Sequence, residues 1–247
     1  MGFSMFERPR HRTIEQLLAA FDAKLLADLG CHFGGGTAIV LSLKEYRESM
    51  DLDFLCSDLN GFKALRNIID RKTLGTLVQG ELHYAREVRS GRDKISTFVK
   101  MNDFPIKVEF IFEGNIHISG ELDQNLGVST LSRIDMYATK LLANADRWKD
   151  LSTNSRDIID LAMMINTWGS IPAEAWHKAK GAYGEIVAKN FEKACAMTHD
   201  SAHILKCLER MGMEQKFAQT IQSSLSSEIR IQRKSISKHT NLGSQSL

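Results

Sequence analysis

The spacing of hydrophobic residues in the first part of the chain predicts three helices. From Thr13 to Leu29 apolar residues recur with the period of a helix, and Gly30 then acts as a stop signal. A second helix is expected from Thr37 to Tyr46, directly after the glycines at positions 34–36, and a third from Phe62 to Asp70.

Alternating apolar and polar residues predict strands in the same half of the chain. One strand is expected from Met50 to Cys56, and the region from Glu81 to Phe112 has the pattern of an antiparallel meander. The last strand of the meander begins at Pro105 and places one set of residues on the core face: Ile106, Val108, Phe110 and Phe112. Glu109 therefore points away from the core.

The helical period returns in the second half. A polar stretch from His117 to Ser129 is the best candidate for a linker. The segments that follow it are expected to be helical: Arg133–Arg147, Arg156–Trp168, Ala173–Lys189, Phe191–Met197, Ala202–Met211 and Gln215–Leu225. We therefore expect an α+β protein with a mixed-sheet domain over residues 1–125 and a helical bundle with a basic tail over residues 126–247.

The composition is that of a soluble globular protein. Hydrophobic residues make up 43% and charged residues 25% of the 247 positions, which is enough apolar material for a real core. No apolar run approaches the length of a membrane span, and residues 1–12 lack the apolar core of a signal peptide. We therefore expect a cytoplasmic protein.

Charge and cysteine content add little to this picture. The net charge is +2; residues 1–125 carry 16 basic and 18 acidic residues, and residues 126–247 carry 16 and 12. This asymmetry suits metal binding in the front half and attraction of polyphosphate in the back half, although an ordinary solvated surface explains it about as well. The four cysteines lack close pairs, so buried, reduced thiols are expected rather than disulfides or a CxxC zinc site.

Three carboxylates are the residues best suited to carry chemistry. Asp51 and Asp53, at i and i+2 in a strand, project from one face about 6–7 Å apart at the backbone. Two such ionised groups favour a cation between them, and Glu109 on a neighbouring strand would complete an oxygen ligand set suited to Mg²⁺. The glycines upstream let the backbone approach a phosphate, and the helix expected at Thr37 offers free N–H groups there.

Several short motifs occur in a fixed order along the chain. They are FGGGTAI at residues 33–39, YRESMDLDF at 46–54, KVEF at 107–110, LS and YATKLLA within 131–143, and RDIIDL at 156–161. Together they resemble the signature of the DNA polymerase β-like nucleotidyltransferase superfamily and, more narrowly, of its AbiEii/AbiGii toxin branch. Gly34 stands where many relatives have Lys, which leaves the choice of nucleotide open.

The resemblance implies a role for each matching residue. Asp51, Asp53 and Glu109 would bind two Mg²⁺ ions, and Glu109 is also a candidate base for the attacking hydroxyl. The implied nucleotide-binding residues are Gly35, Gly36, Thr37, Arg47 and Ser49. Lys140 would neutralise phosphate charge, and Asp157 would orient the substrate or the lysine. Without the resemblance, Lys140 and Asp157 are explained by an ordinary exposed ion pair, and Arg47 by a surface charge.

The implied function is the magnesium-dependent transfer of a nucleoside monophosphate from an NTP to an acceptor hydroxyl, with release of pyrophosphate. The resemblance implies a toxin-like enzyme of a bacterial toxin–antitoxin or phage-defence system, with RNA (the 3′ end of tRNA) as acceptor and a cognate antitoxin as partner. Two alternatives stay open: a nucleotidyltransferase that modifies a small molecule or a protein, and an inactive nucleotide-binding module of the same fold. The basic residues from Arg230 to Lys238 are equally compatible with holding RNA and with keeping a tail soluble.

Overall fold

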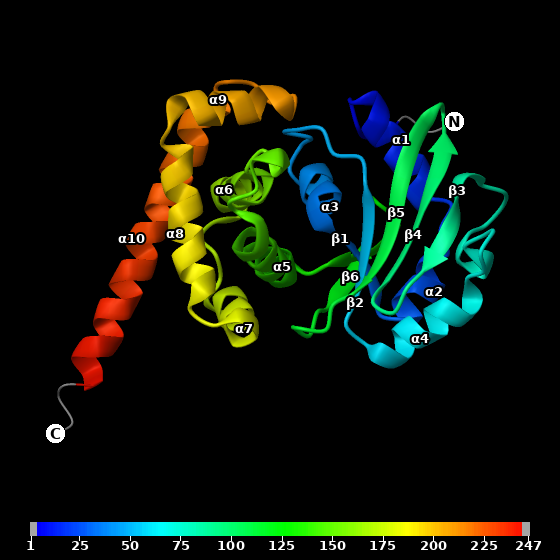
Figure 1. Cartoon of the computed structure of the whole chain (residues 1–247), viewed down its shortest axis with the longest axis horizontal. Helices are drawn as coiled ribbons and strands as arrows, with labels where there is room; N and C mark the ends of the chain where they lie inside the picture. The colour runs from blue at the N-terminus through cyan, green and yellow to red at the C-terminus, as the bar shows by residue number, and fades with distance from the viewer. Residues whose placement is uncertain (1–3, 244–247) are drawn as a thin grey trace. The chain divides into compact units, whose positions relative to one another are not determined.

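The chain divides into two compact units. The computed structural model describes residues 4–243, with side chains as far as residue 234. The units are Met1–Met136 and Tyr137–Leu247, and their elements are labelled in Figure 1. The division falls inside helix α5 (Arg133–Arg147); the division expected from the sequence, after residue 125, lies before it.

In the described part of the first unit, seven strands form one mixed sheet. Their order across the sheet is β3-β4-β5-β2-β1-β7-β6. The β2–β5 and β1–β7 pairs are parallel, and the other neighbouring strands are antiparallel. The strands are β1 (Cys31–Gly34), β2 (Leu52–Cys56), β3 (His83–Ser90), β4 (Lys94–Met101), β5 (Phe104–Phe112), β6 (Gly120–Asp123) and β7 (Val128–Leu131). The predicted mixed sheet is confirmed, and β3, β4 and β5 are the predicted meander.

The helices of this unit differ from the prediction at their ends. They are α1 (Pro9–Leu18), α2 (Ala23–Asp28), α3 (Gly35–Ser42) and α4 (Leu59–Ile68), with a short 3₁₀ turn η1 (Gly75–Leu77). The single helix expected from Thr13 to Leu29 is wrong, because the chain breaks between α1 and α2. Asp22 caps α2 by accepting a hydrogen bond from the Leu25 N–H at 2.8 Å, and the backbone of Phe21 pairs with Val78.

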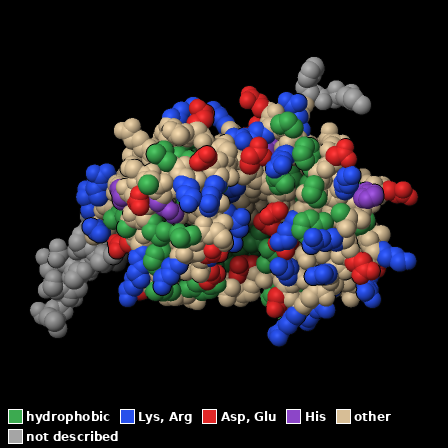
Figure 2. Space-filling model, turned by 45° about the horizontal axis from the view of Figure 1, so that its top comes forward, with side chains coloured by type: hydrophobic (Ala, Val, Ile, Leu, Met, Phe, Trp, Pro, Cys, Tyr) green, Lys and Arg blue, Asp and Glu red, His purple; other side chains and the backbone are tan. Residues whose placement is uncertain are grey.

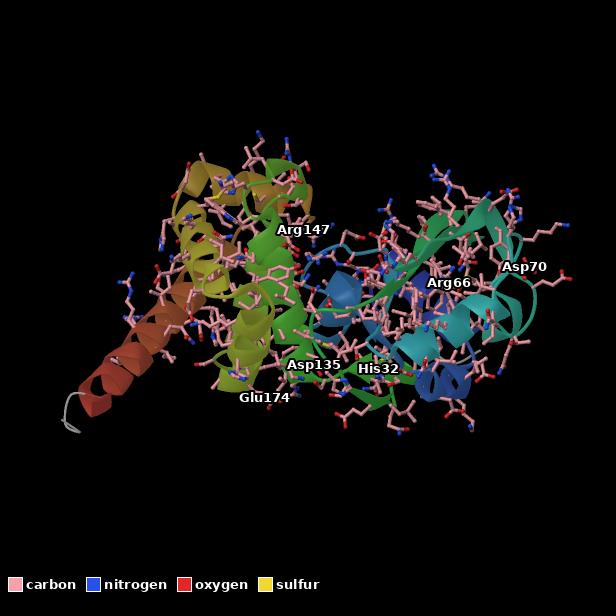
Figure 3. All side chains as sticks on the ribbon, turned by 60° about the horizontal axis from the view of Figure 1, so that its bottom comes forward. His32, Arg66, Asp70, Asp135, Arg147 and Glu174 are labelled. Atoms are coloured by element: carbon pink, nitrogen blue, oxygen red, sulfur yellow. The ribbon has the colours of Figure 1, made fainter. Side chains whose placement is uncertain are left out.

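The stretch from His117 to Ser129 is not a linker, because it adds β6 and the start of β7 to the edge of the sheet. Asp135, fully buried near the start of α5 (Figure 3), accepts hydrogen bonds from the Ser119 N–H at 2.9 Å and the Ser132 hydroxyl at 2.8 Å. These bonds tie the stretch to the unit. The expectation failed because β7 is short and fully buried, and such a strand has no alternation for a sequence pattern to detect.

The alternation predicted for β2 and β5 is confirmed. The rings of Phe54 and Phe110 stack with their centroids 5.1 Å apart and their planes at 14°, and Phe21 packs against both rings. All three side chains are buried. Because strand side chains alternate between faces, this packing places Asp53 and Glu109 on the opposite face of the sheet.

The second unit is helical. It contains most of α5, then η2 (Leu151–Thr153), α6 (Arg156–Trp168), α7 (Ala173–Tyr183), α8 (Ile186–Thr198), α9 (Ser201–Arg210) and α10 (Phe217–Gly243). Helices α5 and α6 have the predicted bounds. The single helix expected from Ala173 to Lys189 is wrong, because Gly184, with φ of 72°, ends α7. Helix α10 packs against α6, α8 and α9 (Figure 1).

The α+β fold expected from the sequence is therefore confirmed. All four cysteines are free and buried, as predicted. No helix in residues 4–243 is both long and apolar enough to cross a membrane. Of the basic segment near the C-terminus, Lys238 lies outside the described side chains.

Substitutions at neighbouring positions of β5 test the assignment of its two faces. Phe110→Ala removes a ring that is 1% exposed and should lower the free energy of unfolding by about 3–5 kcal/mol. Ile111→Ala, on the opposite and half-exposed face, should cost about 1 kcal/mol. Chemical denaturation of the two variants measures the difference, and equal losses would contradict the face assignment.

Candidate active site

A glycine turn at the start of α3 brings the backbone against two side chains of the candidate site. Gly35 has φ of 68°, and a Cβ at this position would collide with the Asp53 carboxylate. A Cβ at Gly36 would lie 2.6 Å from Arg47 Nη2. No side chain caps the N-terminus of α3, so the N–H groups of its first turn, including that of Thr37, have no partner within the helix.

The loop after α3 returns Arg47 and Ser49 to this turn. Arg47 is 4% exposed, and its Nη1 donates to the Glu48 carbonyl at 2.8 Å. The hydroxyls of Thr37 and Ser49 lie 2.8 Å apart. Arg47 is therefore not an ordinary surface charge, and the five residues that the sequence assigned to nucleotide binding lie together.

Asp53 and Glu109 are direct neighbours in the sheet. They are register partners on the parallel strands β2 and β5, so their backbones are about 4.8 Å apart and their side chains share a face. Asp51 is exposed and precedes β2, which begins at Leu52 and not at Met50. The sheet therefore does not fix the Asp51 side chain, contrary to the expected projection of both aspartates from one strand.

The carboxylates do not form a closed metal cage by themselves. Within the part of the chain that the structure describes, no group of three or more His, Cys, Asp or Glu residues is placed to hold a metal ion. The arrangement that the structure does provide is one register pair, Asp53 and Glu109, beside the glycine turn.

Two lysines of the meander neutralise Glu109. Lys107 Nζ lies 2.7 Å from Glu109 Oε2, and Lys94 Nζ lies 3.1 Å from Oε1. Burial acts most strongly and would raise the pKa of Glu109, but the two lysines together outweigh it and hold that pKa below its usual value. Glu109 is therefore ionised at neutral pH.

The N-terminal segment holds the loop that carries Arg47 and Ser49. His11 is fully buried; its Nδ1 lies 2.7 Å from Glu45 Oε1, and its Nε2 accepts from the Ser49 N–H at 3.3 Å. Because Nε2 accepts this bond, the imidazole is neutral and carries its proton on Nδ1. Burial lowers the pKa of His11, against the opposing effect of Glu45, which agrees with the neutral form.

Glu45 connects this histidine to the start of the chain. Its carboxylate accepts hydrogen bonds from the N–H groups of Glu7 at 2.7 Å and Arg8 at 3.1 Å. The Arg8 guanidinium also bonds the Glu45 carbonyl at 3.0 Å and pairs with Glu48 at 3.0 Å. We call residues 7–11 together with Glu45 the N-terminal brace. Sequence reasoning missed it because its contacts join residues that are, for His11 and Glu45, 34 positions apart.

In the helical unit, Lys140 and Asp157 belong to a buried ion network. Lys140 Nζ lies 3.1 Å from Asp157 Oδ1 and 3.0 Å from Asp160 Oδ2. Arg147 of α5 (Figure 3) forks onto Asp157, with Nε 2.6 Å from Oδ2 and Nη2 2.9 Å from Oδ1. Lys140, Asp157 and Asp160 are 5%, 4% and 0% exposed, so this is not the ordinary exposed ion pair.

Arg147 and Asp160 were missed by sequence reasoning, although one signal was present. Asp157 and Asp160 are three positions apart on α6, a spacing that puts both on one side of a helix. Burial is the strongest influence on Asp157 and opposes its charge, but Lys140 and Arg147 overcome it and hold the pKa of Asp157 far below its usual value.

Comparisons with known proteins identify a family and a fold. Residues 16–227 match the model of a family described as nucleotidyl transferase AbiEii toxin, type IV toxin–antitoxin system. A crystal structure of a candidate nucleotidyltransferase from H. pylori is similar with a TM-score of 0.54 at 14% identity, covering 91% of this chain and 95% of that one. The crystal structure of JHP933 from Helicobacter pylori has a TM-score of 0.53 at 16% identity, covering 96% and 99%. No curated protein matches the chain.

Two substitutions of His11 separate the two bonds of the N-terminal brace. An Asn amide can replace Nδ1 and keep the bond to Glu45, whereas a Gln amide can replace Nε2 and keep the bond from Ser49. His11→Asn should therefore speed hydrogen exchange of the Ser49 amide about five- to tenfold, the scale of one lost hydrogen bond. His11→Gln should leave that rate nearly unchanged. Similar rates in both variants would show that His11 does not hold the loop.

Acidification should lower the stability of the helical unit, because Asp157 becomes protonated. The pKa of Asp157 is lowered in the folded protein, so its stabilising contribution is complete at neutral pH. It is lost progressively as the pH falls below about 4, the usual value for Asp, towards the lower folded value. Thermal unfolding between pH 7 and pH 2 should show this loss in the wild type. The loss should be smaller in Asp157→Asn and unchanged in Asp146→Asn, which alters an exposed residue of α5.

Proposed function

Since the chain belongs to the AbiEii nucleotidyl transferase toxin family, we propose that it transfers a nucleoside monophosphate from an NTP to an acceptor hydroxyl and releases pyrophosphate. The observation that carries this proposal is the position of the glycine turn against Asp53, which is itself the register partner of Glu109. The proposed phosphate site and the pair of carboxylates would thereby be adjacent within one unit.

The nucleotide would be held by its phosphates. The uncapped first turn of α3 offers the N–H groups of Gly35, Gly36 and Thr37 and the positive end of the helix dipole. Arg47 lies against Gly36, and Ser49 against Thr37, so a guanidinium and two hydroxyls border the same turn. This combination supports the binding of a triphosphate better than either feature alone.

The carboxylates of Asp53 and Glu109 are chemically suitable ligands for a divalent cation. Carboxylate oxygens are the ligands that Mg²⁺ prefers, and Mg²⁺ is usually bound by one or two carboxylates together with substrate phosphates and water. Asp53 and Glu109 would supply such a pair, and the exposed Asp51 would join it. When bound, Mg²⁺ (two ions in the proposal) would polarise the phosphoryl oxygens and stabilise the charge on the pyrophosphate.

The electrostatics of Glu109 favour one of its two proposed roles. A carboxylate whose pKa is held below its usual value is a weak base for an attacking hydroxyl. The same low pKa keeps the carboxylate ionised, as a metal ligand must be. Lys94 and Lys107, which occupy its two oxygens, are partly exposed and would move aside for a cation. We therefore propose metal binding as the main role of Glu109, which stays a candidate base for the attacking hydroxyl.

In the helical unit we propose that Asp157 orients Lys140, which would neutralise phosphate charge. The support is the buried network, in which Lys140 is held by two carboxylates while Arg147 balances their charge. The proposed acceptor is RNA, specifically the 3′ end of tRNA, and the proposed partner is a cognate antitoxin, as the family description implies. The proposed place of action is the cytoplasm, where NTPs and RNA are available.

The proposal is tested by incubating the purified protein with each labelled NTP, Mg²⁺ and total tRNA. The wild type should label RNA and release pyrophosphate, and removal of divalent cations should stop both. Asp53→Asn and Glu109→Gln should each reduce transfer by about a hundredfold or more, the scale on which one electrostatic group at a reacting centre acts. Glu121→Gln, which alters an exposed carboxylate on β6, is the matched control and should retain full activity.

Each alternative has a distinct outcome in this assay. Undiminished transfer by Asp53→Asn would refute the assigned chemistry. Tight NTP binding without pyrophosphate release would identify an inactive nucleotide-binding module. Transfer to a small molecule or to a protein, with none to RNA, would replace the proposed acceptor and leave the chemistry in place.

A further inference from the structure

The face of the meander that carries Glu109 is strongly basic. The register of β3, β4 and β5 pairs Arg86 with Phe98, Arg89 with Ser96, Phe98 with Lys107, and Ser96 with Glu109, and paired residues share a face. We call the following six residues the basic face: Arg86, Arg89, Lys94, Phe98, Lys100 and Lys107. Figure 2 shows basic (blue), acidic (red) and hydrophobic (green) side chains side by side on the visible side of the molecule.

The cations of the basic face are accessible and poorly balanced by acids. Arg86, Arg89, Lys94 and Lys100 are exposed, and Lys107 is half-buried. Among the β3–β5 residues that the register places on this face, all within the described part of the chain, Glu109 is the only acid. Lys100 also pairs with Asp103, in the turn between β4 and β5, at 3.0 Å. Five cations against these two carboxylates still give this face a positive potential that attracts a polyanion.

One aromatic ring lies among these charges. Phe98 is half-buried on β4, and the Arg86 guanidinium lies over it, with Cζ 4.5 Å from the ring centroid. A planar guanidinium on an aromatic ring forms a flat platform at the surface. Nucleic-acid bases stack on such arginine and aromatic planes.

The order of the strands places the basic face on one side of Glu109 and the glycine turn on the other. Asp53 on β2 lies beside the glycine turn, Glu109 lies on the next strand, and the basic face extends from there over β4 to β3. The phosphate-binding turn and the basic face are therefore on opposite sides of Glu109. A chain bound along the basic face can present its end to the carboxylate pair without entering the nucleotide site.

We propose that the basic face binds a single-stranded segment of the acceptor RNA, with a base stacked on the Arg86–Phe98 platform and the terminal hydroxyl directed to Asp53 and Glu109. This inference rests on the proposed function, because it names the place of the acceptor in that reaction. The basic residues bind the RNA backbone, and the platform selects unpaired bases. An acidic peptide would pair with the basic side chains but would have no base to stack on the Arg86–Phe98 platform.

Binding of a short, fluorescent single-stranded RNA, measured by anisotropy without NTP, tests the basic face directly. The double variant Arg86→Ala/Arg89→Ala should bind about tenfold or more weakly. Its plot of log affinity against log salt should be shallower by about 1.4, for two lost cations. Phe98→Leu, which keeps an apolar side chain but removes the ring, should bind at least about fivefold more weakly.

The matched control is the double variant Lys63→Ala/Arg66→Ala. Both residues are exposed on α4, which packs on the core face of the sheet through Phe62 and Phe112; Arg66 is labelled in Figure 3. This control removes the same charge and should bind RNA within about twofold of the wild type, because distant charges are screened at physiological salt. In the transfer assay, the variants of the basic face should raise KM for RNA and leave KM for NTP unchanged.

The outcomes separate this inference from the function on which it rests. Transfer to RNA with an unchanged KM in the Arg86→Ala/Arg89→Ala variant would overturn the basic face and leave the function standing. Weaker RNA binding in that variant, in a protein that transfers nucleotide to no acceptor, would support the basic face as an RNA site and overturn the function. Equal losses in the α4 control, or tighter binding of a polyglutamate peptide than of RNA at this face, would overturn the inference.

Discussion

The parallel pairing of β2 with β5 is the interaction on which the candidate site depends. One side of this pair is the stack of Phe54 on Phe110, and the other side carries Asp53 and Glu109 in register. A slip of one residue would turn the rings to solvent and the carboxylates into the core. The hydrophobic effect therefore sets the position of two charged groups that no direct attraction brings together.

Periodicity predicted those parts of the fold in which one face is buried and the other is not. The meander, α5 and α6 follow from alternation or from a helical period. Periodicity could not predict two kinds of feature: a fully buried strand and the exact termini of helices. The strand β7 is buried throughout and shows no alternation, and the ends of α2 and α7 depend on local events, a cap by Asp22 and a left-handed Gly184. Such events act over one or two residues, whereas periodicity needs a longer segment.

The candidate site was predictable where its residues are close in sequence or belong to an ordered motif. Gly36 with Arg47 and Lys140 with Asp157 are in contact, although their chemical roles are proposals. The residues that surround them were not predictable. His11 and Asp160 look like ordinary polar residues in the sequence, and only folding reveals that both are fully buried. A buried polar side chain needs a particular hydrogen-bond partner, because an unpaired polar atom inside a protein costs free energy. The role of such a residue therefore depends on its partners in the fold.

Most of the N-terminal brace lies outside the segment by which the family is recognised. Residues 7–11 lie before the segment 16–227 that the family shares, yet one of them, His11, binds the backbone of Ser49 within that segment. A chain trimmed to the shared segment would keep every motif residue and lose the histidine that immobilises one of them. The residues that define the family and the residue that holds their loop in place are therefore different parts of this chain, and a change in the second can disturb the site without altering any of the first.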